Sequence, residues 1–146
     1  MAAIMLCVDF SRLTKRSVEV ATDLGRALEL PIHVVHVRTG STATKHVVTS
    51  DQYKRFRAKE VASDTQAFST IVSAVEETGL PVTSHIARGD IVDVLVRQAQ
   101  SVDARYIVMG SHGTGGMRHL VVGSVAGGVL KELDIPVLLV PSEKEV

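Results

Sequence analysis

The hydrophobic positions of this chain form short unbroken runs that alternate with longer segments of helical period. Five runs rich in branched residues predict strands at residues 4–8, 32–37, 82–87, 105–109 and 137–140. Most of these runs are apolar at consecutive positions, as expected for strands that helices cover on both faces. The run at 82–87 is more polar, because it contains Thr83, Ser84 and His85, and it predicts an edge strand.

Four helices are expected between these strands. Apolar residues recur every three or four positions over residues 14–30, and Pro31 then ends the pattern. A long helix is expected over 51–78, where an apolar stripe runs along one face and Gly79 marks the end. Its stripe consists of Tyr53, Phe56, Val61, Thr65, Phe68, Val72 and Val75. Asp90 is a suitable N-cap for a third helix, and a fourth begins at Ser124 and ends near Asp134.

Strands and helices in this order predict an α/β fold with a parallel sheet. We expect a flavodoxin-like, Rossmann-like three-layer α/β/α sandwich, doubly wound, with five strands in the order 3-2-1-4-5. No internal repeat or linker divides the sequence, so residues 1–146 are interpreted as one domain. Such sheets bind ligands outside the carboxyl ends of their strands, where the winding direction reverses. The residues that follow the first and fourth strands are therefore the candidates for a site.

Composition excludes several classes of function. Sixteen Lys and Arg balance sixteen Asp and Glu, so no overall positive field attracts nucleic acid or anionic lipid. Two tyrosines and three phenylalanines are too few for a series of base-stacking platforms. One cysteine cannot form an internal disulfide, and the apolar start of the chain is too short for a membrane span and lacks a basic leader. We expect a soluble, cytoplasmic protein.

A glycine pattern follows the fourth predicted strand. Gly110 is followed after two residues by Gly113 and, after nine more, by Gly123 and Ser124. Glycine at a strand end lets a ligand approach the main chain, and the free N–H groups of a helix that begins at Ser124 favour an anion such as phosphate. The alternative is that these glycines only form tight turns.

Asp9 lies at the end of the first predicted strand. Its carboxylate can accept hydrogen bonds from ribose hydroxyls or an adenine amino group, or hold a Mg²⁺ ion that binds phosphates. The alternative role is an N-cap for the following helix, which Ser11 could fill instead.

With these motifs the chain resembles the universal stress protein family, in its ATP-binding branch. The resemblance extends over essentially the whole sequence, and the Gly110, Gly113, Gly123-Ser124 spacing matches the ATP motif of that family. It implies a nucleotide-dependent regulatory or signalling module in the stress response, with ATP and Mg²⁺ as ligands. It also implies a homodimer formed through the last strand, whose apolar edge at 137–140 would otherwise be exposed.

The resemblance assigns the nucleotide contacts residue by residue. Adenine and ribose would be held by Asp9 and by the main chain at Cys7, Val8 and Val37. Met109 and Gly110 would flank the ribose and phosphates. His112 and Gly113 would line the phosphate loop, and the terminal phosphates would be held by Gly123, Ser124 and Val125.

Gly127 and Gly128 depart from the family pattern, which often has better helix formers at these positions. Each glycine inside a helix costs ~1 kcal/mol relative to alanine. Either they loosen the helix that holds the γ-phosphate, or they let another backbone pack closely, for example across a dimer.

Three functions remain open at this stage. A nucleotide-binding switch would use ATP to order the loop at 114–122. A slow ATPase or phosphotransferase could use Asp9 for metal, but the sequence offers no catalytic base beside the γ-phosphate, so no catalytic residue is assigned and efficient turnover is not expected. AMP or cyclic AMP could replace ATP, and a partner-binding scaffold with an empty cleft is the third possibility.

The histidines and the cysteine add little chemistry to these hypotheses. His33 and His36 lie three positions apart on a strand and should point to opposite faces of the sheet. His46 and His85 are expected at the surface, and Cys7 is interpreted as a small buried hydrophobic residue.

Overall fold

The computed structural model describes residues 2–39, 50–111 and 123–142. These residues form one parallel sheet in the order β3-β2-β1-β4-β5, which confirms the expected fold class and strand order. Its strands are β1 (Ala3–Cys7), β2 (Ile32–Arg38), β3 (Val82–Arg88), β4 (Ala104–Gly110) and β5 (Val137–Val140). Each begins and ends within one residue of its predicted bounds, and β3 is an edge strand as predicted.

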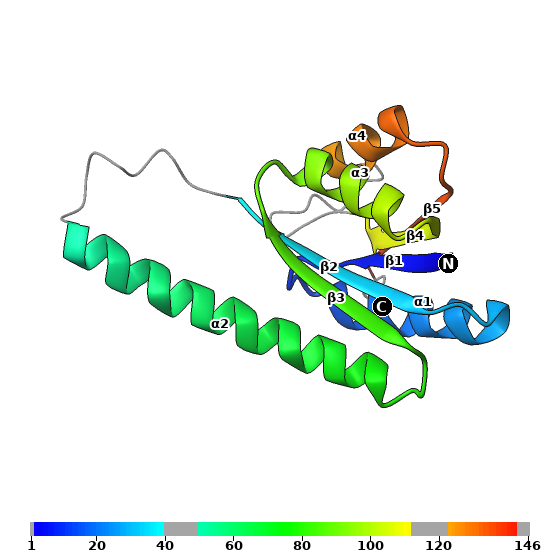
Figure 1. Ribbon diagram of the computed structural model, residues 1–146, viewed down its shortest axis with the longest axis horizontal. Helices are drawn as coiled ribbons and strands as arrows, with labels where there is room; N and C mark the ends of the chain where they lie inside the picture. The colour runs from blue at the N-terminus through cyan, green and yellow to red at the C-terminus, as the bar shows by residue number, and fades with distance from the viewer. Residues whose placement is uncertain (1, 40–49, 112–122, 143–146) are drawn as a thin grey trace.

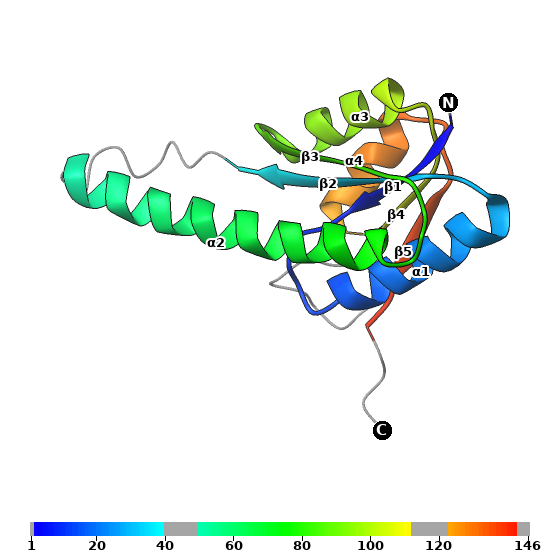
Figure 2. The same cartoon turned by 60° about the horizontal axis from the view of Figure 1, so that its bottom comes forward.

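Helices cover both faces of this sheet. Figure 1 shows α1 (Thr14–Leu28) and α2 (Ser50–Glu76) on one side and α3 (Ile91–Ser101) and α4 (Ser124–Glu132) on the other. Figure 2 shows the same two layers after a rotation of the molecule. Alternate residues of β1 point to opposite faces, so Ile4 and Leu6 pack with α1 and α2 while Met5 packs with α3 and α4.

The long helix α2 extends well beyond the sheet. Its 27 residues span about 40 Å, whereas the seven residues of β3 span about 23 Å. Consequently only the C-terminal part of the predicted apolar stripe is buried: Phe68 is 6% exposed, but Phe56 is 65% exposed. None of the described helices, including α2, is sufficiently long and apolar to cross a bilayer.

The end of α1 differs from the prediction. The helix stops at Leu28 rather than at residue 30, because Glu29 adopts a left-handed conformation with φ of 55°. The N–H groups of Glu29 and Leu30 both donate to the carbonyl of Gly25, which closes the last turn. The helix therefore ends before Pro31, and the left-handed turn at Glu29, not the proline, ends it.

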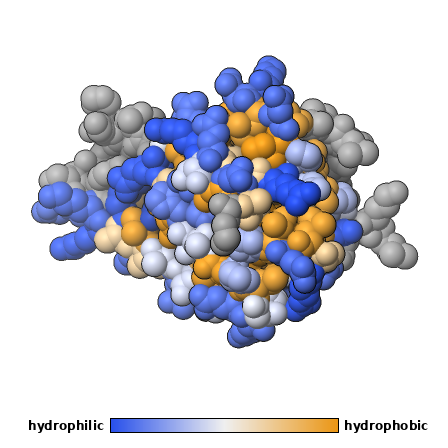
Figure 3. Space-filling view, turned by 45° about the vertical axis from the view of Figure 1, so that its right-hand side comes forward, coloured by the Kyte–Doolittle hydropathy of each residue, from blue (hydrophilic) through white to orange (hydrophobic). Residues whose placement is uncertain are grey.

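The edge of the sheet at β5 carries exposed apolar side chains. Leu138 of β5 is 39% exposed and Leu130 of the neighbouring α4 is 49% exposed. Figure 3 shows apolar surface on the side of the molecule that carries these two elements. Within the described part of the chain β5 pairs with β4 only, so one edge of β5 is unpaired.

The two glycines of α4 have different surroundings. A Cβ atom built on Gly128 would lie 2.7 Å from Cγ2 of Val92 on α3, so this glycine allows two helices of the same chain to pack closely. A Cβ atom on Gly127 would have no neighbour within 4 Å. Close packing thus explains Gly128, and only Gly127 is free to accept a side chain.

We predict opposite responses of stability to alanine at these two positions. Gly127→Ala should raise the free energy of unfolding by ~1 kcal/mol, because alanine is the better helix former. Gly128→Ala should not raise it, because displacing the stiff Val92 side chain costs about 1–3 kcal/mol. Urea denaturation of both variants measures the difference, and equal shifts of the two midpoints would contradict this account of α4.

Candidate functional site

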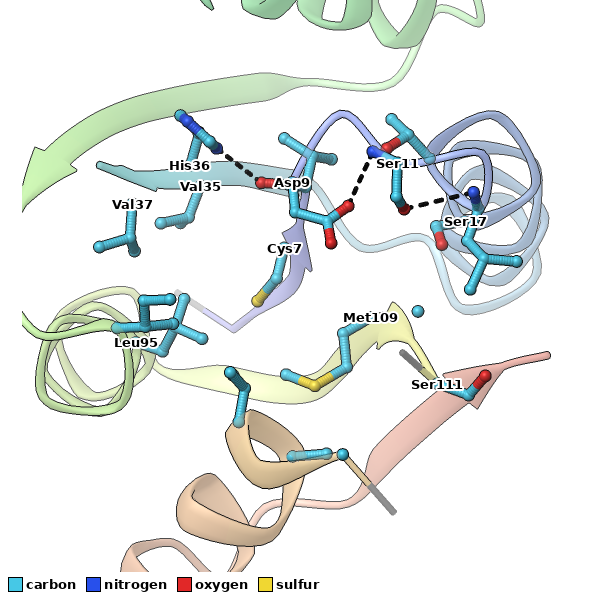
Figure 4. Close-up of a pocket in the computed structure, with 18 of the residues that line it drawn as sticks. Cys7, Asp9, Ser11, Ser17, Val35, His36, Val37, Leu95, Met109 and Ser111 are labelled. Atoms are coloured by element: carbon cyan, nitrogen blue, oxygen red, sulfur yellow. Dashed lines mark hydrogen bonds between the residues drawn. The ribbon is translucent and has the colours of Figure 1, made fainter. Parts of the chain in front are cut away.

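A cavity of about 470 Å³ opens at the carboxyl ends of β1 and β4. These strands are neighbours in the sheet, but the chain leaves β1 toward α1 on one face and β4 toward α4 on the other. The cavity therefore lies at the reversal of winding, where doubly wound sheets bind ligands. Its volume falls within the range of small-molecule sites. Figure 4 shows side chains from both strands and the adjoining helices around it.

Most residues that the sequence assigns to nucleotide contacts line this cavity. They are Cys7, Val8, Asp9, Val37, Met109, Gly110, Gly123, Ser124 and Val125. The other two assigned residues, His112 and Gly113, lie outside the described residues, as does the loop at 114–122. The fold thus brings residues from β1, β2, β4 and α4 to one place, although they are far apart in the sequence.

One part of the cavity wall is apolar. Cys7, Val37, Leu95 and Met109 surround it in Figure 4. Cys7 is half-buried and packs against the apolar cluster of α3 and α4, as expected for a small hydrophobic residue, but its side chain also lines the cavity. Burial raises the pKa of the Cys7 thiol to about 12. The thiol therefore stays neutral near pH 7, and this wall suits the face of an aromatic base.

Two helix N-termini form another part of the wall. The N-cap residues of α1 and α4 are Leu13 and Gly123, and neither provides a side-chain cap. The contrast is α3, where the Asp90 carboxylate accepts a hydrogen bond of 3.0 Å from the N–H of Asp93, as predicted. Uncapped first-turn N–H groups attract anions. The helix ends that line the cavity at Leu13 and Gly123 therefore suit phosphate groups.

A buried hydroxyl adds to this polar wall. Oγ1 of Thr14 is buried and has no hydrogen-bond partner within the described part of the chain. Such an oxygen is costly unless a ligand or water completes its hydrogen bonds. A Cβ atom on Gly123 would lie 3.2 Å from the carbonyl oxygen of Ser111, so there the main chain itself forms the wall. These features fit a phosphorylated ligand.

Several lining residues were not assigned from the sequence. They are Ser11, Leu13, Thr14, Ser17, Val35, His36, Ile91, Leu95, Ser111 and Ala126. Thr14 and Ser17 could have been identified from the sequence, because they place two hydroxyls one helical turn apart at the start of an apolar stripe. Ser17 is only 2% exposed, which is unusual for a serine that faces solvent or caps a helix.

Asp9 holds the turn between β1 and α1. Its Oδ1 accepts a hydrogen bond of 3.0 Å from the N–H of Ser11, and Oγ of Ser11 accepts one of 3.3 Å from the N–H of Leu13. Neither residue is the N-cap of α1, since that position belongs to Leu13. The exposed carboxylate lines the cavity. No cluster of three metal-ligating side chains occurs among the described residues, so a cation at Asp9 would need ligand phosphates to complete its coordination.

The two histidines of β2 point to opposite faces, as predicted. His33 hydrogen-bonds with Thr83 and with Gln98 of α3, at 2.6 and 2.8 Å. His36 lies on the other face, where Nε2 is 4.0 Å from Asp64 of α2. His36 lines the cavity and His33 does not. His85 is exposed, as expected, and His46 lies outside the described residues.

Comparisons with known proteins agree with this arrangement. A universal stress protein from Methanocaldococcus jannaschii, MJ0531, is 31% identical over 80 residues, which cover 55% of this chain and 47% of that protein. The chain thus spans about half the length of that relative. The solved structure of MJ0577 superposes with a TM-score of 0.81 at 21% identity and covers 97% of both chains, which shows the shared fold.

A second solved structure is more informative about ligands. The universal stress protein from Archaeoglobus fulgidus in complex with dAMP has a TM-score of 0.69 and 25% identity, and covers 95% of this chain and 97% of that one. The model of the universal stress protein family matches residues 1–141. The chain therefore belongs to the universal stress protein family.

Proposed function

We propose that this protein is a nucleotide-binding regulatory module of the stress response whose ligand is ATP with Mg²⁺. The observation that carries the proposal is the cavity at the winding reversal, with two uncapped helix N-termini beside an apolar wall. This combination suits a ligand with an aromatic base at one end and anionic groups at the other. The dAMP complex of the Archaeoglobus fulgidus relative supports an adenine nucleotide.

The base would lie beside β2. This strand continues to Arg38, while β1 ends at Cys7, whose register partner is Val35. Main-chain groups of alternate residues point to the same side of a strand, so those of Val37 point toward the side of β1, beyond its end. An N–H donor and a C=O acceptor on one residue can pair with N1 and the 6-amino group of adenine. We therefore assign adenine to Val37, next to Cys7 and Val8.

The phosphates would lie at the start of α4. Met109 and Gly110 lead from β4 into the cavity, and Gly123, Ser124 and Val125 begin α4 on its wall. Asp9 lies between these regions, where its carboxylate can reach ribose hydroxyls or a phosphate-bound Mg²⁺. We include His112 and Gly113 in the phosphate site on the family motif alone.

Slow ATP hydrolysis or phosphate transfer is the alternative. Efficient phosphoryl transfer needs a residue that positions the nucleophile beside the terminal phosphate. The described residues at the phosphate end of the cavity offer hydroxyls, those of Thr14, Ser111 and Ser124, which do not act as bases near neutral pH. The switch is therefore the better-supported function.

Calorimetry of the purified protein with ATP and Mg²⁺, AMP and cyclic AMP, followed by a phosphate-release assay, tests this proposal. Saturable ATP binding in the micromolar range without appreciable release is expected for a switch. Turnover at ~1 s⁻¹ or faster would instead favour an enzyme. Absence of saturable binding by any of these nucleotides would contradict the proposal and leave a scaffold.

Ser124→Ala tests the placement of the phosphates. Loss of a hydroxyl that donates to the terminal phosphates should weaken ATP binding about tenfold and leave AMP binding nearly unchanged. Ser69→Ala, at an exposed position of α2, is the matched control and should alter neither affinity. Equal losses for ATP and AMP in Ser124→Ala would refute this placement.

We also propose a homodimer that forms through β5. The support is the unpaired edge of this strand and the exposed side chains of Leu138 and Leu130 beside it. Light scattering should give a dimer for the wild-type chain and a monomer for Leu138→Lys, because a lysine at this edge places a charge in the interface. A monomeric wild-type protein would rule this arrangement out.

A further inference from the structure

The hydrogen-bond ladder between β1 and β2 stops in an unusual way. The N–H of Val8 still donates to the carbonyl of Val35, at 3.0 Å, so Val8 continues the parallel pairing beyond β1. In a regular parallel ladder the next bond would join the N–H of Val37 to the carbonyl of Val8. Instead, this carbonyl accepts a hydrogen bond of 2.8 Å from Nδ1 of His36, which Figure 4 shows as a dashed line.

The imidazole ring is held firmly in this position. His36 is 8% exposed, and its ring packs against that of Phe10, with 4.2 Å between the centroids and an angle of 38° between the planes. Phe10 has a positive φ of 62°, which is strained for a bulky residue and turns the chain back over the histidine. On the far edge of the ring, Nε2 faces the Asp64 carboxylate at 4.0 Å, and Arg38 holds the same carboxylate at 3.5 Å.

This contact fixes the protonation of one ring nitrogen. A carbonyl oxygen can only accept hydrogen bonds, so Nδ1 of His36 carries hydrogen whether the ring is neutral or charged. The donor at Val8 is therefore permanent. The N–H of Val37, by contrast, donates no hydrogen bond to Val8 or to another described residue on that side, and Val37 lines the cavity.

We propose that His36 is a positioning residue for base recognition. The carbonyl of Val8 points at Nδ1 of His36 and not at Val37, so the ladder stops one bond early and the main-chain N–H of Val37 stays open for the edge of adenine. The inference rests on the proposed nucleotide function, and it assigns to His36 control of the base end of the site, with no role at the phosphates.

Calorimetry with ATP and with inorganic tripolyphosphate, which lacks the base, tests this role. In His36→Phe the N–H of Val37 should bond to the freed carbonyl of Val8, so ATP affinity should fall about tenfold while tripolyphosphate affinity stays the same. In His36→Asn the amide nitrogen can take the place of Nδ1, and ATP affinity should return to within about twofold of wild type.

Matched variants separate this role from general destabilisation. His33→Phe removes the other buried histidine of β2, outside the cavity, and should bind ATP as wild type does. If His36→Phe does not fold, His36→Gln replaces it, because a glutamine amide reaches the position of Nε2 and leaves the Val8 carbonyl unoccupied. Wild-type ATP affinity in His36→Phe or in His36→Gln, or an equal loss of ATP and tripolyphosphate affinity in them, would overturn the inference.

Hydrogen exchange of the Val37 amide, followed by NMR without nucleotide, gives an independent measurement. The amide should exchange rapidly in the wild-type protein and at least about tenfold more slowly in His36→Phe, because it gains a ladder bond. A Val37 amide already protected in the wild type would overturn the inference even if ATP binds. Conversely, if the wild type binds no ATP, the proposed function fails and base recognition by Val37 fails with it, whatever the exchange rates.

Discussion

The reversal of winding direction at β1, where strands are added first on one side and then on the other, is the constraint on which this molecule depends. Right-handed connections from β1 to β2 and from β2 to β3 place α1 and α2 on one face, and those from β3 to β4 and from β4 to β5 place α3 and α4 on the other. The chains that leave β1 and β4 therefore separate at the carboxyl ends of two neighbouring strands. The cavity lies between these two diverging segments, and the strand order brings the lining residues of β1 and β4 to it.

The N-termini of α1 and α4 at the cavity lack the side-chain hydrogen bonds that usually cap a helix. A side-chain cap stabilises a helix by about 1 kcal/mol, and α3 has one in Asp90. The helices α1 and α4 lack such a cap, although both line the cavity, and Oγ1 of Thr14 is unpartnered among the described residues. The two helix N-termini without a side-chain cap and the Thr14 hydroxyl lie together at one end of the site. A phosphorylated ligand would satisfy them jointly, which gives binding a stabilising effect on both helices.

Much of the fold and part of the site could be predicted from the sequence. Consecutive apolar runs identified most strands of the sheet, because a strand buried on both faces leaves a strong pattern, and the more polar run of β3 marked an edge strand. Strand order followed from handedness. Asp9 and Gly123 could be placed at the cavity because they lie within two residues of the end of β1 and of the start of α4. Positions at element ends are therefore the most predictable part of a doubly wound site.

Other features could not be predicted, for identifiable reasons. The stripe of α2 keeps its period past the edge of the sheet, so the sequence does not show that Phe56 has nothing to pack against. Periodicity put His36 on the correct face of β2 but could not show that its ring reaches the carbonyl of Val8, since that depends on the left-handed turn at Phe10.

The part of β2 that extends beyond β1 connects these observations. Residues 36–38 pair with β3 on one side only, because β1 has already ended on the other. An unpaired strand edge inside a protein would leave main-chain groups without partners, which is costly unless water or a ligand reaches them. Here the edge faces the cavity, and Arg38 and His36 both contact Asp64 of α2. Residues 36–38 thus place main-chain groups at the cavity and attach the long helix to the sheet, so the cavity wall and the packing of α2 depend on one short stretch of strand.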